Sequence, residues 1–201
     1  MGEGTNVRRL LWLGMGLILL IVVGVLLYDW WPRRDILPPA AEPASGVTAR
    51  EALAPAAELA AQWQEDARLA VVSGRWSGVE MQQGDDVEWA FQFFSPSTQR
   101  LALVLVSGGA ARMVRDSLSP YRVPTFSTGE WRVDSDQALR AWWDSGGSTV
   151  VARRPDVELA MQLRVPDEGD DPVWTVAGVF FEQESAFVVV VNATSGVLVE
   201  Q

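Results

Sequence analysis

The sequence predicts an α+β protein in which an N-terminal transmembrane helix precedes two units, each a helix packed on a three-stranded antiparallel sheet. Three observations predict it: an apolar block near the N-terminus, a Pro- and Ala-rich segment after it, and helix, turn and strand signals that occur twice in the same order. The expected segments are a tail (1–9), the transmembrane helix (10–28), a linker (29–47), a first unit (48–115), a connector (116–130) and a second unit (131–201).

The apolar block runs from Leu10 to Tyr28 without a charge, close to the roughly 20 residues that span a hydrocarbon core. It is followed by Trp30, Trp31 and Pro32, a pattern typical of an interfacial aromatic belt and a helix stop. A cleaved signal peptide is the alternative, but its apolar region is shorter, about 7 to 15 residues, and small residues follow it directly. The pattern therefore favours one membrane-spanning helix.

Arginine positions leave the orientation of this helix open, because Arg8 and Arg9 before it are matched by Arg33 and Arg34 after it. A short tail, one span and a large C-terminal domain form the usual signal-anchor arrangement, and long domains cross the membrane largely regardless of charge. We therefore expect a single-pass cell-membrane protein whose C-terminal domain is extracytoplasmic. The linker, which contains PRRDILPPAAEPASG, is expected to be an extended spacer.

The first unit opens with Thr48 and Glu51, the Thr-x-x-Glu capping box of a helix that we expect to run to about Gln64. Pro55 is expected to kink this helix or to move its start one turn later. A first strand is expected at 67–75, where the helical pattern has ended and apolar residues predominate.

The second unit has the same order of signals. A helix is expected to start at Asp134 or Ser135 and to end at Gly146-Gly147, where glycine favours a left-handed cap. The strand Val157–Val165 follows, because apolar and polar residues alternate through VELAMQLRV.

A longer correspondence links the two units. Aligning GDDVEW at Gly84–Trp89 with GDDPVW at Gly169–Trp174 also aligns the apolar runs LALVLV and AFVVVV without a gap. Each copy is therefore expected to form turn, strand, turn, strand. Gly and Asp favour tight turns, so we interpret each Asp-Asp doublet as a hairpin turn. The alternative is a single domain whose halves resemble each other by chance.

Composition excludes many kinds of chemistry, because every basic residue is arginine and lysine, histidine and cysteine are absent. The chain has no Ser-His-Asp or Cys-His nucleophile, disulfide, Walker-type phosphate loop, Schiff base or ordinary zinc site. We predict no enzyme activity, no catalytic residue, no cofactor and no metal site. The net charge of −10 argues against nucleic acid as a partner. Arginine in place of lysine, with much Ala, Val and Trp, indicates a GC-rich bacterial genome.

Two patterns could still carry chemistry. Carboxylates suitable for calcium cluster at Asp167, Glu168, Asp170 and Asp171, although EF-hand spacing is absent. The triplet Asp144-Ser145-Gly146 matches the Asp-Ser/Thr-Gly loop of aspartic peptidases, but it ends a helical pattern and no second triplet exists to share a proton with it. We interpret the first as a turn and the second as a helix C-cap.

Tryptophan is frequent in this chain. Four tryptophans are expected to face the core of the two units: Trp63, Trp89, Trp142 and Trp174. Three others, Trp76, Trp131 and Trp143, fit either the core or an exposed aromatic patch that binds a partner, because tryptophan is enriched at binding hot spots.

The helix plus three strands, the entry WRVDSDQAL at Trp131–Leu139 and the ending VVVVNATSGVLVE at Val188–Glu200 together resemble the PepSY domain family. The ending is similar to that family's last strand, short Ala-x-x-Gly turn (Ala193–Gly196) and closing strand. The resemblance covers about 134–201 directly and 48–107 through the internal correspondence. The first copy departs from it, with Ser107-Gly108-Gly109 in place of the Ala-x-x-Gly turn.

The resemblance implies a non-catalytic, extracytoplasmic and often membrane-tethered module that binds or restrains peptidases or other envelope proteins. It transfers no site residue, because the matching positions are turns and caps. We therefore expect a membrane-anchored tandem PepSY-like protein with a protein partner. The alternative is a small accessory subunit held in a larger membrane complex by its transmembrane helix.

Overall fold

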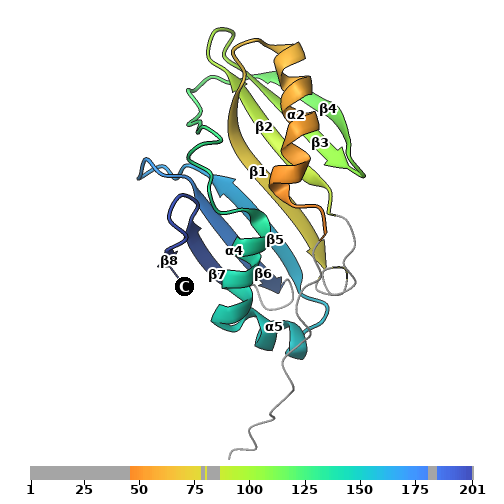
Figure 1. Ribbon diagram of the computed structural model, residues 1–201, viewed down its shortest axis with the longest axis vertical. Helices are drawn as coiled ribbons and strands as arrows, with labels where there is room; N and C mark the ends of the chain where they lie inside the picture. The colour runs from red at the N-terminus through yellow and green to blue at the C-terminus, as the bar shows by residue number, and fades with distance from the viewer. Residues whose placement is uncertain (1–45, 78–79, 81–86, 181–184, 201) are drawn as a thin grey trace, which may run out of the picture. The chain divides into compact units, whose positions relative to one another are not determined.

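The computed structural model describes residues 46–77, 80, 87–180 and 185–200. These residues form an α+β fold with one eight-stranded antiparallel sheet in the order β4-β3-β2-β1-β5-β6-β7-β8. Helices α2 and α4 lie on the same face of this sheet (Figure 1). The elements are α2 (Ala49–Trp63), β1 (Arg68–Ser77), β2 (Trp89–Ser95), β3 (Arg100–Ser107), β4 (Ala110–Leu118), α4 (Ser135–Trp142), the π-helical turn η1 (Trp143–Gly147), α5 (Ser148–Arg153), β5 (Glu158–Arg164), β6 (Val173–Phe180), β7 (Ser185–Asn192) and β8 (Leu198–Glu200).

The expectation of two separate three-stranded sheets is wrong in two respects. Strands β1 and β5 pair along their length, from Val71 opposite Arg164 to Ser77 opposite Glu158, so the strands of both halves form a single sheet. Each half also contributes a fourth strand at an edge, β4 in the first half and β8 in the second. Joining β1 to β5 satisfies two strand edges that separate sheets would leave unpaired.

Helix α2 begins where the capping box predicts. Thr48 is the N-cap, Glu51 N donates to Thr48 Oγ1 at 3.2 Å, and Thr48 N donates to Glu51 Oε2 at 2.9 Å. The helix ends at Trp63 with Gln64 as its C-cap. The expected shift of its start by Pro55 is wrong, because the helix runs from Ala49 through Pro55, and the reciprocal cap bonds fix its first turn.

Helix α4 also has a capping box, formed by the N-cap Asp134 and Gln137. Its expected end at Gly146-Gly147 is wrong: the chain makes a π-helical turn and continues as α5, although Gly146 has the positive φ of 131° expected of a glycine cap. A Cβ at Gly147 would lie 2.2 Å from the ring of Trp142, so this turn can close only around glycine.

The aligned segments of the two halves form equivalent strands, β2 with β6 and β3 with β7. Trp89 Nε1 donates to Val47 O at 2.9 Å, and Trp174 Nε1 donates to Val133 O at 2.8 Å. Each acceptor immediately precedes the N-cap of the helix in the same half. The turn predicted at Gly169 joins the paired strands β5 and β6, which confirms it as a hairpin connection. Residues 84–86 of the other doublet lie outside the described residues.

Tryptophan side chains cross the boundary between the halves on the helix side of the sheet. Trp89 packs edge-on against Trp174 with ring centroids 6.4 Å apart, and Trp174 packs in the same way against Trp131 at 6.0 Å. Trp76 adds a further edge contact with Trp89 at 6.3 Å. One hydrophobic core therefore serves both halves.

No helix among the described residues is long and apolar enough to cross a membrane. The predicted membrane-spanning segment Leu10–Tyr28 lies outside the described residues, and so does nearly all of the linker.

Asp134 links the starts of both helices, because its Oδ1 accepts hydrogen bonds from Ser135 N at 2.7 Å and from Arg50 N at 3.2 Å. We predict that Asp134→Ala lowers the free energy of unfolding by about 2 kcal/mol, at the upper end of the range for a lost N-cap. Urea unfolding of the full chain in mild detergent, followed by tryptophan fluorescence, measures the change. Asp136→Ala, an exposed change in the same helical turn, should stay within about 0.5 kcal/mol; equal effects of the two variants would contradict the shared cap.

Candidate functional site

The candidate site is the face of the sheet opposite α2 and α4, which we call the open face. Side chains alternate along each strand, and one set, including Val72, Val104, Leu159 and Val189, is buried in the core below the helices. Most of the other set is half-buried or exposed, with Phe94 near the end of β2 as a buried exception. Strand register places one row of the open face across six strands: Leu105, Ala90, Ser73, Gln162, Thr175 and Val190.

A shallow hollow of about 390 Å³ lies in the middle of the open face, which we call the central hollow. Its lining includes Ala90, Ala160 and Ala177, whose short side chains leave the depression, and the polar side chains of Ser73 and Thr175. These residues come from β1, β2, β5 and β6, so both halves of the chain contribute to it. The hollow therefore depends on the pairing of β1 with β5.

Apolar stripes lie on either side of the central hollow. Leu103 and Leu105 of β3 form one stripe, and Val188 and Val190 of β7 form the other. All four side chains are half-buried. Leu103 aligns with Val188 and Leu105 with Val190 when the two copies of the sequence are superposed, so the open face has an approximately symmetric pattern.

Charged side chains on the open face are mainly arginines. Four arginines occupy it, namely Arg75, Arg112, Arg115 and Arg164, while Glu88 and Glu158 supply carboxylates. Arg112 Nη2 lies 3.3 Å from Glu88 Oε2, and Arg75 Nη1 lies 3.7 Å from Glu158 Oε2. Both pairs are solvent-exposed, and exposed pairs contribute about 0 to 1 kcal/mol each.

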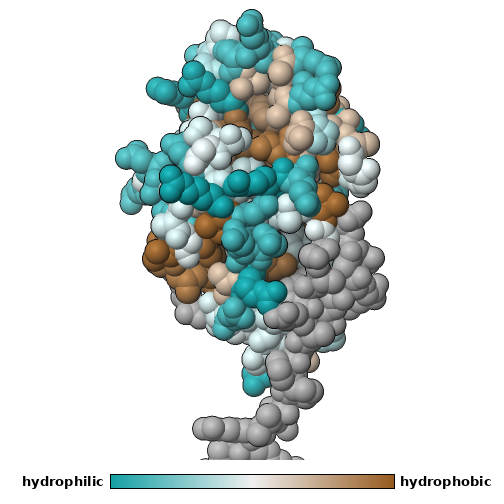
Figure 2. Space-filling model, viewed as in Figure 1, coloured by the Kyte–Doolittle hydropathy of each residue, from teal (hydrophilic) through white to brown (hydrophobic). Residues whose placement is uncertain are grey.

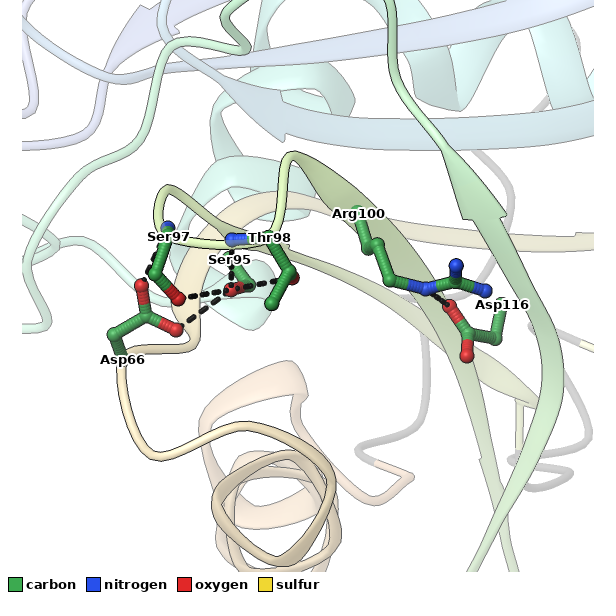
Figure 3. A network of polar contacts seen from close by, with 6 residues as sticks. All are labelled: Asp66, Ser95, Ser97, Thr98, Arg100 and Asp116. Atoms are coloured by element: carbon green, nitrogen blue, oxygen red, sulfur yellow. Dashed lines mark hydrogen bonds and ion pairs between the residues drawn. The ribbon is translucent and has the colours of Figure 1, made fainter.

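Two polar networks near the β2–β3 turn do not form a catalytic arrangement (Figure 3). Ser95 Oγ donates to Asp66 Oδ1 at 2.6 Å, and Ser97 N donates to Asp66 Oδ2 at 2.7 Å. The hydrogen bond from Ser95, followed by that from Ser97, lowers the pKa of Asp66. A carboxylate with a lowered pKa is a poor general base near neutral pH, so this network holds the turn in place.

The second network joins neighbouring strands at the end of α2. Arg100 Nε donates to Asp116 Oδ1 at 2.7 Å (Figure 3), and this bond lowers the pKa of Asp116 and raises the pKa of Arg100. A weaker hydrogen bond from Trp63 also lowers the pKa of Asp116. The pair connects β3 to the edge strand β4 and offers no free nucleophile.

The three tryptophans considered for partner binding do not form an exposed patch. Trp131 and Trp143 are buried, with 1% and 5% of their surfaces exposed, so both belong to the core. Trp76 is half-buried on the helix side of β1 and packs against Trp89. Among the tryptophans expected in the core, Trp89, Trp142 and Trp174 are buried, and Trp63 is half-buried.

The structure also places the aspartic peptidase triplet and the acidic cluster that the sequence raised as alternatives. Asp144 is exposed on the π-helical turn, not in a loop after a strand, so its surroundings differ from those of an aspartic peptidase triplet. In the acidic cluster considered as a calcium site, Asp171 accepts a hydrogen bond from Asn192 Nδ2 at 3.2 Å, and Asp167 lies 3.8 Å from Arg164. Within the described part of the chain, no group of three or more acidic residues is placed to hold a metal ion.

Strand β8 provides a second apolar surface, at one edge of the sheet. Val197, Leu198 and Val199 are 62%, 45% and 62% exposed, and Figure 2 shows a hydrophobic patch where Figure 1 places β8. The strand is only three residues long, and short edge strands offer little backbone for pairing with another chain. The open face is therefore the larger candidate for contact with a partner.

Sequence reasoning missed the open face, although a signal was present. Outward positions of the predicted strands hold Ala, Ser, Leu and Val where a solvated face normally carries charged residues. Their grouping around one hollow becomes visible only once the strand order is known, because the residues come from strands far apart in the chain.

Comparison with known proteins gives little further information. No family model matches the chain, and no curated protein sequence matches it. A search of solved structures finds the crystal structure of a "putative lipoprotein" from Clostridium difficile 630, with 9% identity, a TM-score of 0.49, and coverage of 80% of this chain and 97% of that one. This similarity is too distant to support an inference about function.

The lowered pKa of Asp66 predicts a pH dependence of stability. The ionised carboxylate stabilises the folded state above the unfolded-state pKa of about 3.9, and this contribution is lost as pH falls through the lower folded-state pKa. We predict that Asp66→Asn lowers the urea midpoint at pH 7 and that its curve approaches the wild-type curve as pH falls and the wild-type carboxylate is protonated. Asp144→Asn, at an exposed position, should follow the wild type throughout; an Asp66→Asn curve parallel to wild type would contradict the assignment.

Proposed function

We propose that this chain is a single-pass, membrane-anchored extracytoplasmic protein whose tandem PepSY-like domain binds or regulates another envelope protein, with a peptidase as one candidate. The observation that carries the proposal is the open face: α2 and α4 cover one face of the sheet, and the other carries half-buried apolar side chains around the central hollow. A concave surface lined by apolar side chains and a few polar groups is characteristic of binding sites.

Local geometry at the end of the chain supports the PepSY-like assignment. Asn192 Oδ1 accepts hydrogen bonds from Thr194 N at 2.9 Å and Ser195 N at 2.8 Å, and Gly196 has a φ of 78°. The chain then returns along β7 as β8. This strand, tight turn and closing strand is the arrangement that the Ala193–Gly196 motif implies.

Equivalent bonds in the two halves support the tandem arrangement. Both helices carry capping boxes, and in both halves the tryptophan at the end of the repeated motif donates to the residue before the helix N-cap. The halves differ at the β3–β4 turn, where Gly108 and Gly109 have φ values of 55° and 78° in place of the Ala-x-x-Gly turn.

A non-catalytic role is supported by the chemistry of the described side chains. The chain lacks histidine, cysteine and lysine and has only 2 tyrosines, so the remaining candidates for proton transfer are mainly carboxylates. Hydrogen bonds lower the pKa of Asp66, Asp116, Glu130 and Asp156. These four groups are therefore adapted to stabilise turns and ion pairs and not to accept a proton near neutral pH.

The absence of cysteine permits a direct test of orientation. We predict that a membrane-impermeant maleimide labels Ser195→Cys, an exposed position beside β8, in intact cells. Thr5→Cys, in the predicted cytoplasmic tail, should be labelled only after the cells are permeabilised. Labelling in the opposite pattern would contradict the extracytoplasmic placement of the domain.

Protein binding is tested by in-cell cross-linking with a photoreactive amino acid. We predict that the probe at Gln162, beside the central hollow, gives a discrete adduct with one envelope protein, and that the probe at Glu58, exposed on α2, does not. The adduct should persist when residues 10–28 are replaced by an unrelated hydrophobic helix. Its loss in the exchanged chain would favour the accessory-subunit alternative, and no adduct from either position would contradict a partner at this face.

A further inference from the structure

We infer that the central hollow binds an acidic segment of the partner, laid across the strands with apolar side chains at its two ends. The inference deepens the proposed function, because it rests on the partner being a protein and specifies the chemistry of the segment that binds. Three features of the open face support it: the shape of the hollow, the apolar stripes and the charged side chains.

The backbone beneath the hollow determines how a segment can bind. Strands β1 and β5 are each hydrogen-bonded to a neighbour on both sides, so they offer no free strand edge to an added strand. The occupant must therefore be recognised through side chains. The five strand spacings from the β3 stripe to the β7 stripe measure roughly 24 Å, the length of about seven extended residues.

The floor of the hollow favours close approach of a polypeptide. Ala160 lies between Arg75 and Ala177 in one row, and Ala90 lies beside Ser73 in the next. The alanine and serine side chains are short, so a segment can approach the sheet closely and still reach hydrogen-bonding groups of Ser73, Gln162 and Thr175. The stripes at Leu105 and Val190 then accept apolar side chains on either side.

The charges select an acidic segment. Among the described residues, the open face carries Arg75, Arg112, Arg115 and Arg164 against the carboxylates of Glu88, Glu158 and the neighbouring Asp167, although the whole chain has a net charge of −10. The ion pairs of these arginines with described residues measure 3.3 Å for Arg112, 3.7 Å for Arg75 and 3.8 Å for Arg164, and Arg115 forms none with the described residues. Arginine binds carboxylates in a planar, bidentate geometry, so incoming carboxylates can replace these weak exposed pairs.

An anionic membrane surface is the other source of negative charge near an anchored domain. A concave site suits it less well than a polypeptide does, because side chains of a bound segment can enter the central hollow, whereas a flat membrane surface would pass over it. The experiment therefore includes a lipid arm whose positive result overturns the inference.

The test uses the full chain in mild detergent and a fluorescently labelled random copolymer of glutamate and tyrosine, with binding followed by anisotropy. We expect saturable binding that is about tenfold weaker for Arg75→Glu, which lines the central hollow, and unchanged for Arg153→Glu, an exposed arginine on α5 with the same charge change. A lysine–tyrosine copolymer should not bind. Equal weakening by both variants, or no binding of the acidic copolymer, would overturn the inference.

A second variant separates shape from charge. Ala160→Trp fills the central hollow and should weaken copolymer binding at least about tenfold, while Ala54→Trp, exposed on α2, should not. Circular dichroism of both variants should match wild type, because both side chains point away from the core. Wild-type affinity in a folded Ala160→Trp variant would show that the hollow is not the binding site.

The lipid arm uses Gln162→Cys carrying an environment-sensitive dye, in proteoliposomes of zwitterionic or anionic lipid. We expect a blue shift on addition of the acidic copolymer in zwitterionic lipid; a blue shift caused by anionic lipid alone would assign the open face to the membrane. The cross-linking result is independent of this arm. A protein adduct at Gln162 without preference for the acidic copolymer would preserve the proposed function and overturn only this inference.

Discussion

Pairing between β1 and β5 holds the two halves in one sheet, because each strand would otherwise present an unpaired edge beside half of a core. The pairing brings the tryptophan of β2 against that of β6, so the cores below the helices become continuous. It also creates the central hollow, whose alanines come from β2 on one side and from β5 and β6 on the other. Stability and the candidate site therefore depend on the same contact.

Hydrogen bonds at the helix starts reinforce this junction on the covered face. Ser135 Oγ accepts from Ala49 N at 2.9 Å, and Asp134 Oδ1 accepts from Arg50 N at 3.2 Å, so residues of α4 complete the N-terminus of α2. The Arg50 guanidinium packs over the Trp131 ring, 5.3 Å from its centroid. These bonds fix the helix starts relative to each other, and a rotation of one half against the other would break them. The open face is consequently a preorganised surface.

Sequence patterns predicted the parts of this fold that local interactions determine. The start of α2 followed from a capping box, the start of α4 followed from the N-cap residues Asp134 and Ser135, and β5 followed from strict alternation. Strand β4 was missed because it is an edge strand. Its residues are at most half-buried, so apolar residues do not recur at every second position. Helix α5 was missed because Gly146-Gly147 resembles a stop signal, whereas here glycine makes room for Trp142. The β1–β5 pairing joins residues far apart in sequence, and no local pattern specifies it.

Local sequence patterns also failed to predict the candidate site. The reason is a difference between the polar contacts on the two faces of the sheet. Asp134 accepts a short hydrogen bond from the backbone of the next residue, Ser135, which is why a sequence motif reveals it, whereas Asp66 accepts from Ser97 in a distant turn and no motif marks it. Arg75 and Arg112 on the open face meet carboxylates across strands and at longer distances, so no motif marks them. Tight local bonds secure the fold, whereas the loosely paired open-face charges can exchange partners at little cost. A surface of that kind suits binding better than stabilisation of the fold.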